Sequence, residues 1–143
     1  MAVANLHETV LMYKVRKAEL TNEISELQTQ KRLATYSQAD VQSLLSSEQH
    51  SVRDYFKALY EGDTELQEKY LDYTQIPDFE EAIDRITAEF QDQLDELAAW
   101  ETALDAQITT DSAELEEVNA YLESMKSMEQ SNIQEDFNYG LNG

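Results

Sequence analysis

The sequence contains no cysteine, one proline and three glycines in 143 residues. Without cysteine, the chain has no disulfide framework and no thiolate ligand for a metal or redox centre. So little glycine and proline, in a composition rich in Glu, Leu, Ala, Gln and Ser, is typical of helices. Alternating β-branched residues between turn residues, which would indicate strands, are also missing. These absences predict an all-α chain, and the length predicts a single helical domain, residues 1–143.

The only proline and the only internal glycine, Pro77 and Gly62, lie close together near the middle of the sequence. We expect Gly62 to adopt the left-handed conformation that ends a helix, and Pro77 to open the next helix. Between them, Thr64–Gln67 has the pattern of a capping box, which predicts a short helix. The expected elements are a first helix (3–61), a tip with a short helix (62–77) and a second helix (78–138).

Both predicted helices carry mostly apolar residues at alternating steps of four and three, the spacing of a coiled-coil seam. The first seam is Leu6, Val10, Tyr13, Lys17, Leu20, Ile24, Leu27, Lys31, Ala34, Gln38, Val41, Leu45, Glu48, Val52, Tyr55 and Leu59. The second is Phe79, Ile83, Ile86, Phe90, Leu94, Leu97, Glu101, Leu104, Ile108, Asp111, Leu115, Val118, Leu122, Met125, Glu129, Ile133 and Phe137. Two seams of similar length predict a long antiparallel coiled-coil helical hairpin.

An alternative to two continuous helices remains open. The helix formers are weakest at Thr35–Ser37 and Thr109–Ser112, and Asp111–Glu114 has the pattern that caps a fresh helix start. Breaks near residues 36 and 110 would give a three- or four-helix bundle.

Negative charge is concentrated in one part of the sequence. The formal net charge is −20. Residues 1–60 are neutral overall, so residues 61–143 carry the whole excess. Direct nucleic-acid binding is disfavoured, because it depends on Lys and Arg neutralising phosphates, and anionic membranes are disfavoured for the same reason. The acids form either a solvated face that keeps the chain soluble or a surface for a basic protein partner.

The sequence shows no segment for membrane insertion or Sec-type export. It has no run of eighteen apolar residues and no basic start followed by an apolar stretch. We therefore expect no membrane insertion and a cytoplasmic location by default. Export without a cleaved signal and a place in a virion remain the alternatives.

No combination of residues indicates catalysis or metal binding. A carboxylate-bridged metal site in a helical bundle needs Glu-x-x-His pairs, and neither His7 nor His50 has a glutamate three residues before it. There is no glycine-rich phosphate loop and no calcium-binding loop. We expect no catalytic site, cofactor or metal, and therefore no enzyme.

Two aromatic and apolar groups are candidate interfaces, because tyrosine and phenylalanine are favoured at protein contacts. The tip group either binds a partner or forms a small core that holds the short helix. The C-terminal group either is an assembly surface or fastens the two termini together. Lys14, Arg16 and Lys17 form the only basic cluster, which is suited to pairing between subunits. The candidate interface residues are Tyr55, Phe56, Tyr60, Tyr70, Tyr73, Ile133, Phe137 and Tyr139.

Matched seams over Leu6–Leu59 and Phe79–Phe137, without a signal peptide, resemble the type III needle and filament subunits and the terminal helices of flagellins. The resemblance implies a structural protein. We expect a non-enzymatic assembly protein that acts through coiled-coil oligomerisation, such as a filament or virion component. The alternative is an acidic binding module for a basic protein, acting as an adaptor, a chaperone or a decoy that mimics DNA.

Overall fold

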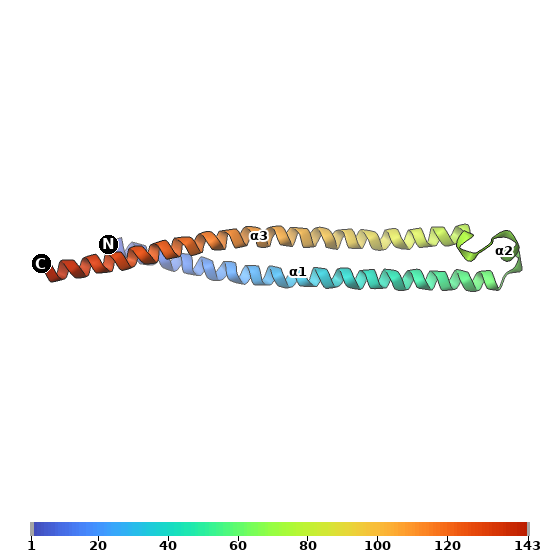
Figure 1. Ribbon diagram of the computed structural model, residues 1–143, viewed down its shortest axis with the longest axis horizontal. Helices are drawn as coiled ribbons and strands as arrows, with labels where there is room; N and C mark the ends of the chain where they lie inside the picture. Colours follow the sequence, from blue (N-terminus) through green and yellow to red (C-terminus); the bar gives the residue numbers. More distant parts are fainter. Residues whose placement is uncertain (1, 143) are drawn as a thin grey trace. The chain divides into compact units, whose positions relative to one another are not determined.

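A computed structural model describes the backbone of residues 2–142 and the side chains of residues 5–133. No strand occurs in this described backbone, so the predicted all-α class is confirmed. Two of the three α-helices are long (Figure 1). The elements are α1 (Ala2–Glu61), α2 (Thr64–Lys69), the 3-10 turn η1 (Tyr73–Gln75) and α3 (Pro77–Asn142).

Both long helices continue through the two weak zones, so the alternative with breaks near 36 and 110 is wrong. The physical reason is local. Thr35, Thr109 and Thr110 each donate their hydroxyl to the backbone carbonyl four residues earlier, at 3.1, 2.9 and 3.0 Å. These bonds satisfy the threonine hydroxyls inside the helix, where they would otherwise compete for other backbone groups.

The end of α1 differs from its prediction in two details. The φ angle of Gly62 is not positive, so α1 ends without a left-handed residue, and the Gly62 N–H donates to the Ala58 carbonyl at 3.1 Å. The cap of α2 is Asp63 rather than Thr64. The Asp63 carboxylate accepts a hydrogen bond from the Glu65 N–H at 2.9 Å. Aspartate suits this place because it satisfies a free N–H group and carries charge that the helix N-terminus favours.

The chain then passes from α2 to α3 through a second aspartate cap. Helix α2 ends at Lys69. The Asp72 carboxylate accepts from the Thr74 N–H at 3.1 Å and so begins η1. Helix α3 starts at Pro77, as predicted from the fixed φ of proline at a first helical position.

Contacts divide the chain into two compact units. Unit 1 comprises Met1–Gln30 and Leu104–Gly143, and unit 2 comprises Lys31–Ala103. Each unit therefore contains a segment of α1 and a segment of α3. The buried side chains of unit 1 are Val10, Leu20, Leu104, Asp111 and Val118, and those of unit 2 are Ala34, Phe56, Ile76 and Phe79.

The predicted buried positions of α3 are correct from Phe79 to Glu129, all of which are buried or half-buried. Ile133 is 56% exposed and departs from the prediction. Phe137 lies outside the residues whose side chains are described.

The predicted positions of α1 are buried or half-buried from Leu6 to Leu45, except Lys17, and again at Val52, whereas Glu48, Tyr55 and Leu59 are exposed. The buried positions step by four from Val41 to Leu45 and by four again from Leu45 to Gln49. Two consecutive steps of four are a stutter, which moves the buried face by one position. Gln49, Phe56 and Tyr60 thus replace Glu48, Tyr55 and Leu59, and Arg16 replaces Lys17.

Candidate functional site

The aromatic tip of unit 2 is a packed cluster. Phe56, Ile76 and Phe79 are buried. The Phe79 ring meets the rings of Phe56 and Tyr73 edge to face, at centroid distances of 5.6 and 5.3 Å. Such edge-to-face pairs add to the stabilisation that comes from burial alone. Tyr55 also contacts Phe56 at 5.3 Å, but its side chain is 64% exposed.

Hydrogen bonds fasten the tip segment to the end of α1. The Tyr60 hydroxyl donates to the carbonyls of Tyr70 and Leu71, at 2.9 and 3.0 Å. The Gln67 side-chain amide donates to the carbonyls of Tyr60 and Glu61, at 3.0 and 3.1 Å. The last carbonyls of a helix have no partner within the helix, so these bonds satisfy groups that would otherwise need water.

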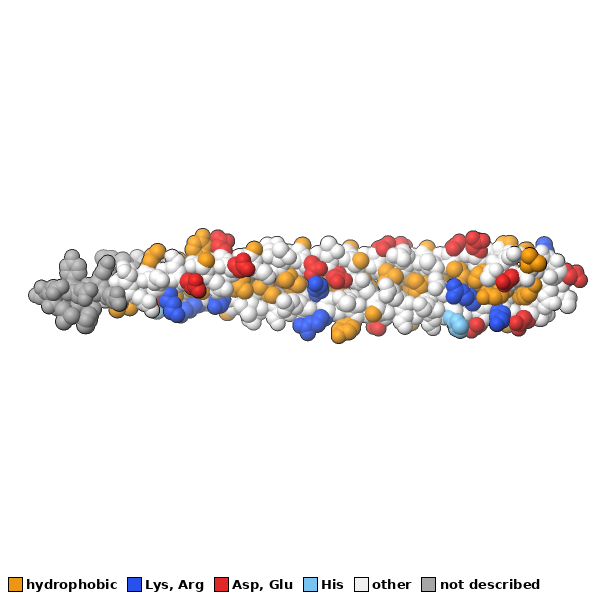
Figure 2. Space-filling view, viewed as in Figure 1, with side chains coloured by type: hydrophobic (Ala, Val, Ile, Leu, Met, Phe, Trp, Pro, Cys, Tyr) orange, Lys and Arg blue, Asp and Glu red, His pale blue; other side chains and the backbone are white. Residues whose placement is uncertain are grey.

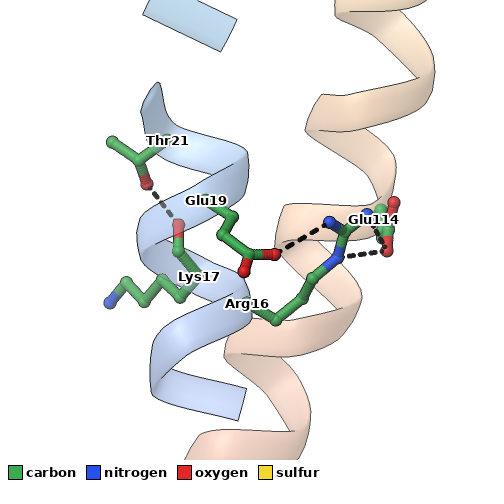
Figure 3. Close-up of polar contacts among 5 residues, drawn as sticks. All are labelled: Arg16, Lys17, Glu19, Thr21 and Glu114. Carbon is green, nitrogen blue, oxygen red and sulfur yellow. Dashed lines mark hydrogen bonds and ion pairs between the residues drawn. The ribbon is translucent and has the colours of Figure 1, made fainter. Parts of the chain in front are cut away.

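Figure 3 shows the strongest polar contact of unit 1, between α1 and α3. Arg16 donates from Nε and Nη2 to one oxygen of Glu114, at 2.9 and 2.8 Å, and from Nη1 to Glu19 at 3.3 Å. These hydrogen bonds raise the pKa of the Arg16 guanidinium, which therefore stays charged. The Lys17 side chain points away from this pair.

Tyr13, one turn before Arg16 on α1, contacts Tyr121 of α3. The rings of Tyr13 and Tyr121 are 5.6 Å apart between centroids and tilted by 35°. The Tyr121 hydroxyl donates to Glu117 at 3.3 Å. This hydrogen bond and the negative charge of Glu117 raise the pKa of the Tyr121 phenol above its ordinary value of 10.0.

One acid of unit 1 lies inside the packing. Asp111 is 5% exposed, and its Oδ2 atom has no hydrogen-bond partner. A buried polar atom without a partner costs about 1–3 kcal/mol, so Asp111 lowers the stability of the seam. It contributes no described polar contact that would offset this cost.

Three of the ten lysine and arginine residues of the protein line a groove of unit 1. Lys14 and Lys17 on α1 and Lys126 on α3 line this groove, which has a volume of about 460 Å³. Glu123 and Glu129 also line it, so three basic and two acidic side chains surround the groove. We call this feature the lysine groove. It can attract negative charge, although the rest of the chain is strongly acidic.

An exposed apolar patch lies on the same part of α1. Leu11, Met12 and Val15 are 47%, 71% and 58% exposed. They line a second hollow, whose lining residues all belong to α1. On the face drawn in Figure 2, hydrophobic side chains reach the surface at many points between charged ones. Neighbouring exposed apolar side chains of this kind mark interaction surfaces.

The predicted interface residues separate into three groups. Phe56, Tyr60, Tyr70 and Tyr73 lie in or against the tip cluster, and Tyr55 is its exposed neighbour. Ile133 is exposed. The side chains of Phe137 and Tyr139 lie outside the described residues.

The sequence reasoning missed the lysine groove, because Lys126 is far from the basic cluster in sequence. A heptad alignment of the two helices would have revealed it, since Val10 and Leu122 are both predicted seam residues and both line the groove. The same alignment would have paired Arg16 with an acid of α3. It would not have shown that Lys17 points away from Arg16.

Within the described part of the chain, no helix is long and apolar enough to cross a bilayer. Between residues 5 and 133, no three His, Cys, Asp or Glu side chains are placed to hold a metal ion. Comparison with protein-family models, with curated proteins and with solved structures finds no match, so the geometry of these surfaces has to carry the functional interpretation.

Proposed function

We propose that this protein is a non-enzymatic structural or assembly protein that acts by oligomerising through a coiled-coil hairpin, as a filament or virion component. The observation that carries the proposal is the balance of apolar side chains. Among the described side chains, eight hydrophobic residues are buried and thirteen large hydrophobic residues are exposed. A chain that leaves thirteen large apolar side chains exposed to water gains stability by packing against other molecules.

The antiparallel arrangement within the proposed hairpin is supported by the order of the contacts. In each unit, residues further along α1 contact residues that come earlier in α3. The contacts of unit 1 are His7 with Glu129, Tyr13 with Tyr121 and Arg16 with Glu114. Those of unit 2 are Gln38 with Glu101, Gln49 with Thr87 and Phe56 with Phe79.

The coiled-coil part of the proposal is supported by the spacing of burial. From Leu20 to Leu45, and again from Leu94 to Met125, positions that are buried or half-buried recur at steps of three and four. A seam this narrow covers one side of each helix and leaves the other sides available for further helices.

Mass measurement at several protein concentrations tests the proposal. We expect light scattering on the purified chain to give a mass of at least two copies. Replacing the apolar patch, in Leu11→Gln/Met12→Gln/Val15→Gln, should lower the assembled fraction. The matched control is Leu71→Gln, since Leu71 is 87% exposed and lies in the tip. A monomer at every concentration, at low and at high salt, would refute the proposal.

A second candidate, an acidic binding module for a basic protein, is favoured by the run of acids on α3. Residues 86–125 contain eleven acids and no lysine or arginine. Binding of this kind weakens steeply with salt, because ions screen exposed charges.

This second candidate is tested by the binding of a lysine-rich peptide, followed by fluorescence anisotropy at several salt concentrations. The test variant neutralises three exposed acids of α3, and the control neutralises three exposed acids of α1. The variants are Asp92→Asn/Glu96→Gln/Glu116→Gln and Glu8→Gln/Glu26→Gln/Asp40→Asn. Equal loss of affinity in both variants would show unspecific attraction and would remove this candidate.

A further inference from the structure

The lysine groove is a basic surface on a protein that is otherwise acidic. Val10 and Leu122 supply its apolar part, and Asn119 supplies an amide. No ion pair among the described residues involves Lys14, Lys17 or Lys126. The three ammonium groups outnumber the carboxylates of Glu123 and Glu129, which also line the groove, so an acidic occupant would gain favourable contacts.

The chain itself contains a surface of the opposite character. On α3, Asp92, Glu96 and Trp100 are spaced by four residues, so they share one face of the helix. All three side chains are exposed, and Trp100 is 37% exposed. They belong to the stretch 86–125, whose sequence contains eleven acids and no lysine or arginine. We call these three residues the acidic face.

We propose that the lysine groove of one copy binds the acidic face of a second copy. The inference rests on the proposed function and names the contact through which the copies associate. Asp92 and Glu96 of the second copy lie against the three ammonium groups. Trp100 of the second copy lies against Leu11, an exposed residue one turn before Lys14. In this position the ammonium group of Lys14 and the indole ring of Trp100 also attract each other.

This contact joins two different surfaces, and the relation between the copies decides the kind of assembly. Each copy has one lysine groove and one acidic face, so a pair that makes this contact once still has one of each free. If a two-fold axis relates the copies, the pair makes the contact twice and closes as a dimer; any other relation is heterologous and generates rings or open filaments. Charge complementarity fixes the register of the copies and speeds their encounter.

The test uses charge reversal of the full-length chain, with circular dichroism to show that each variant remains helical. The groove variant is Lys14→Glu/Lys17→Glu/Lys126→Glu. The face variant is Asp92→Lys/Glu96→Lys. The matched control reverses three exposed bases of α1 in unit 2, as Arg32→Glu/Arg53→Glu/Lys57→Glu, and changes the net charge by the same amount as the groove variant.

We expect the wild type and the control to form assemblies of two or more copies at low salt. The groove and face variants should each need about tenfold more protein to assemble, given the usual strength of two or three exposed ion pairs. Salt should weaken the wild-type assembly, because the screening length falls from about 10 Å at 0.1 M to about 3 Å at 1 M.

A mixture of the two variants gives the decisive result. The groove variant keeps an intact acidic face, and the face variant keeps an intact groove. Equal amounts should therefore recover the wild-type assembly, because the intact face binds the intact groove and the reversed groove attracts the reversed face. A mixture that stays monomeric would overturn the pairing of these two surfaces. Groove variants that assemble like the wild type would also overturn it while leaving the proposed function standing, whereas a monomeric wild type would remove both.

Discussion

Replacing Asp111 by leucine should stabilise the protein. The Asp111 side chain is 5% exposed and its Oδ2 atom is unpaired, so the folded state bears the desolvation of a polar group without a compensating bond. Removing that group recovers about 1–3 kcal/mol, and the leucine adds apolar contacts in the seam. For a chain of this size, we expect the melting temperature to rise by about 3–10 °C.

The assay is urea unfolding followed by circular dichroism, at one fixed protein concentration because assembly itself contributes to stability. The matched control is Asp84→Leu at an exposed position of α3, which gives the same change in helix propensity, about 0.5 kcal/mol. Asp111→Asn should gain less than Asp111→Leu, since the amide is still polar. If Asp111→Leu is no more stable than Asp84→Leu, the Asp111 carboxylate has a partner in solution and the reasoning is refuted.

Two further predictions concern the tip and the alkaline limit of stability. Phe56→Ala should lower the free energy of unfolding by about 3 kcal/mol, because Phe56 is buried between rings. Tyr55→Ala, at the exposed neighbouring residue, should lower it by less than half as much. Equal losses in urea unfolding would contradict the tip packing. The hydrogen bond to Glu117 raises the pKa of folded Tyr121, so the unfolded chain loses this proton first as pH rises. The resulting stabilisation is fully present below pH 10.0 and disappears as pH passes through the raised pKa. Tyr121→Phe should therefore show a shallower alkaline loss of stability, and an unchanged profile would count against the Tyr121–Glu117 bond.

The sequence predicted the helices and most buried positions, because hydrophobic spacing governs both. Its errors on α1 occur where spacing is ambiguous. Tyr55 and Phe56 are adjacent aromatic residues, so the pattern alone gives no reason to bury one rather than the other. The structure buries Phe56 because its ring meets Phe79, a contact that depends on the path of the tip.

The candidate surfaces were only partly predictable, because a surface depends on residues that are distant in sequence. Lys14, Arg16 and Lys17 read as one basic cluster, but Arg16 binds Glu114, and Lys17 lines the groove with Lys126. The weak zones read as breaks because propensity scales count each threonine as unfavourable. They do not include the bonds that threonine hydroxyls make to their own helix.

The compact tip also has a consequence for the order in which the chain folds. Phe56 and Phe79 are roughly twenty residues apart, whereas His7 and Glu129 are separated by 122. Closing the longer loop first would cost about 1.5 kcal/mol more in chain entropy. The aromatic cluster is therefore the least costly of these contacts to form first. During synthesis, Phe79 soon follows Phe56, whereas His7 must wait for Glu129 to emerge before the two can meet.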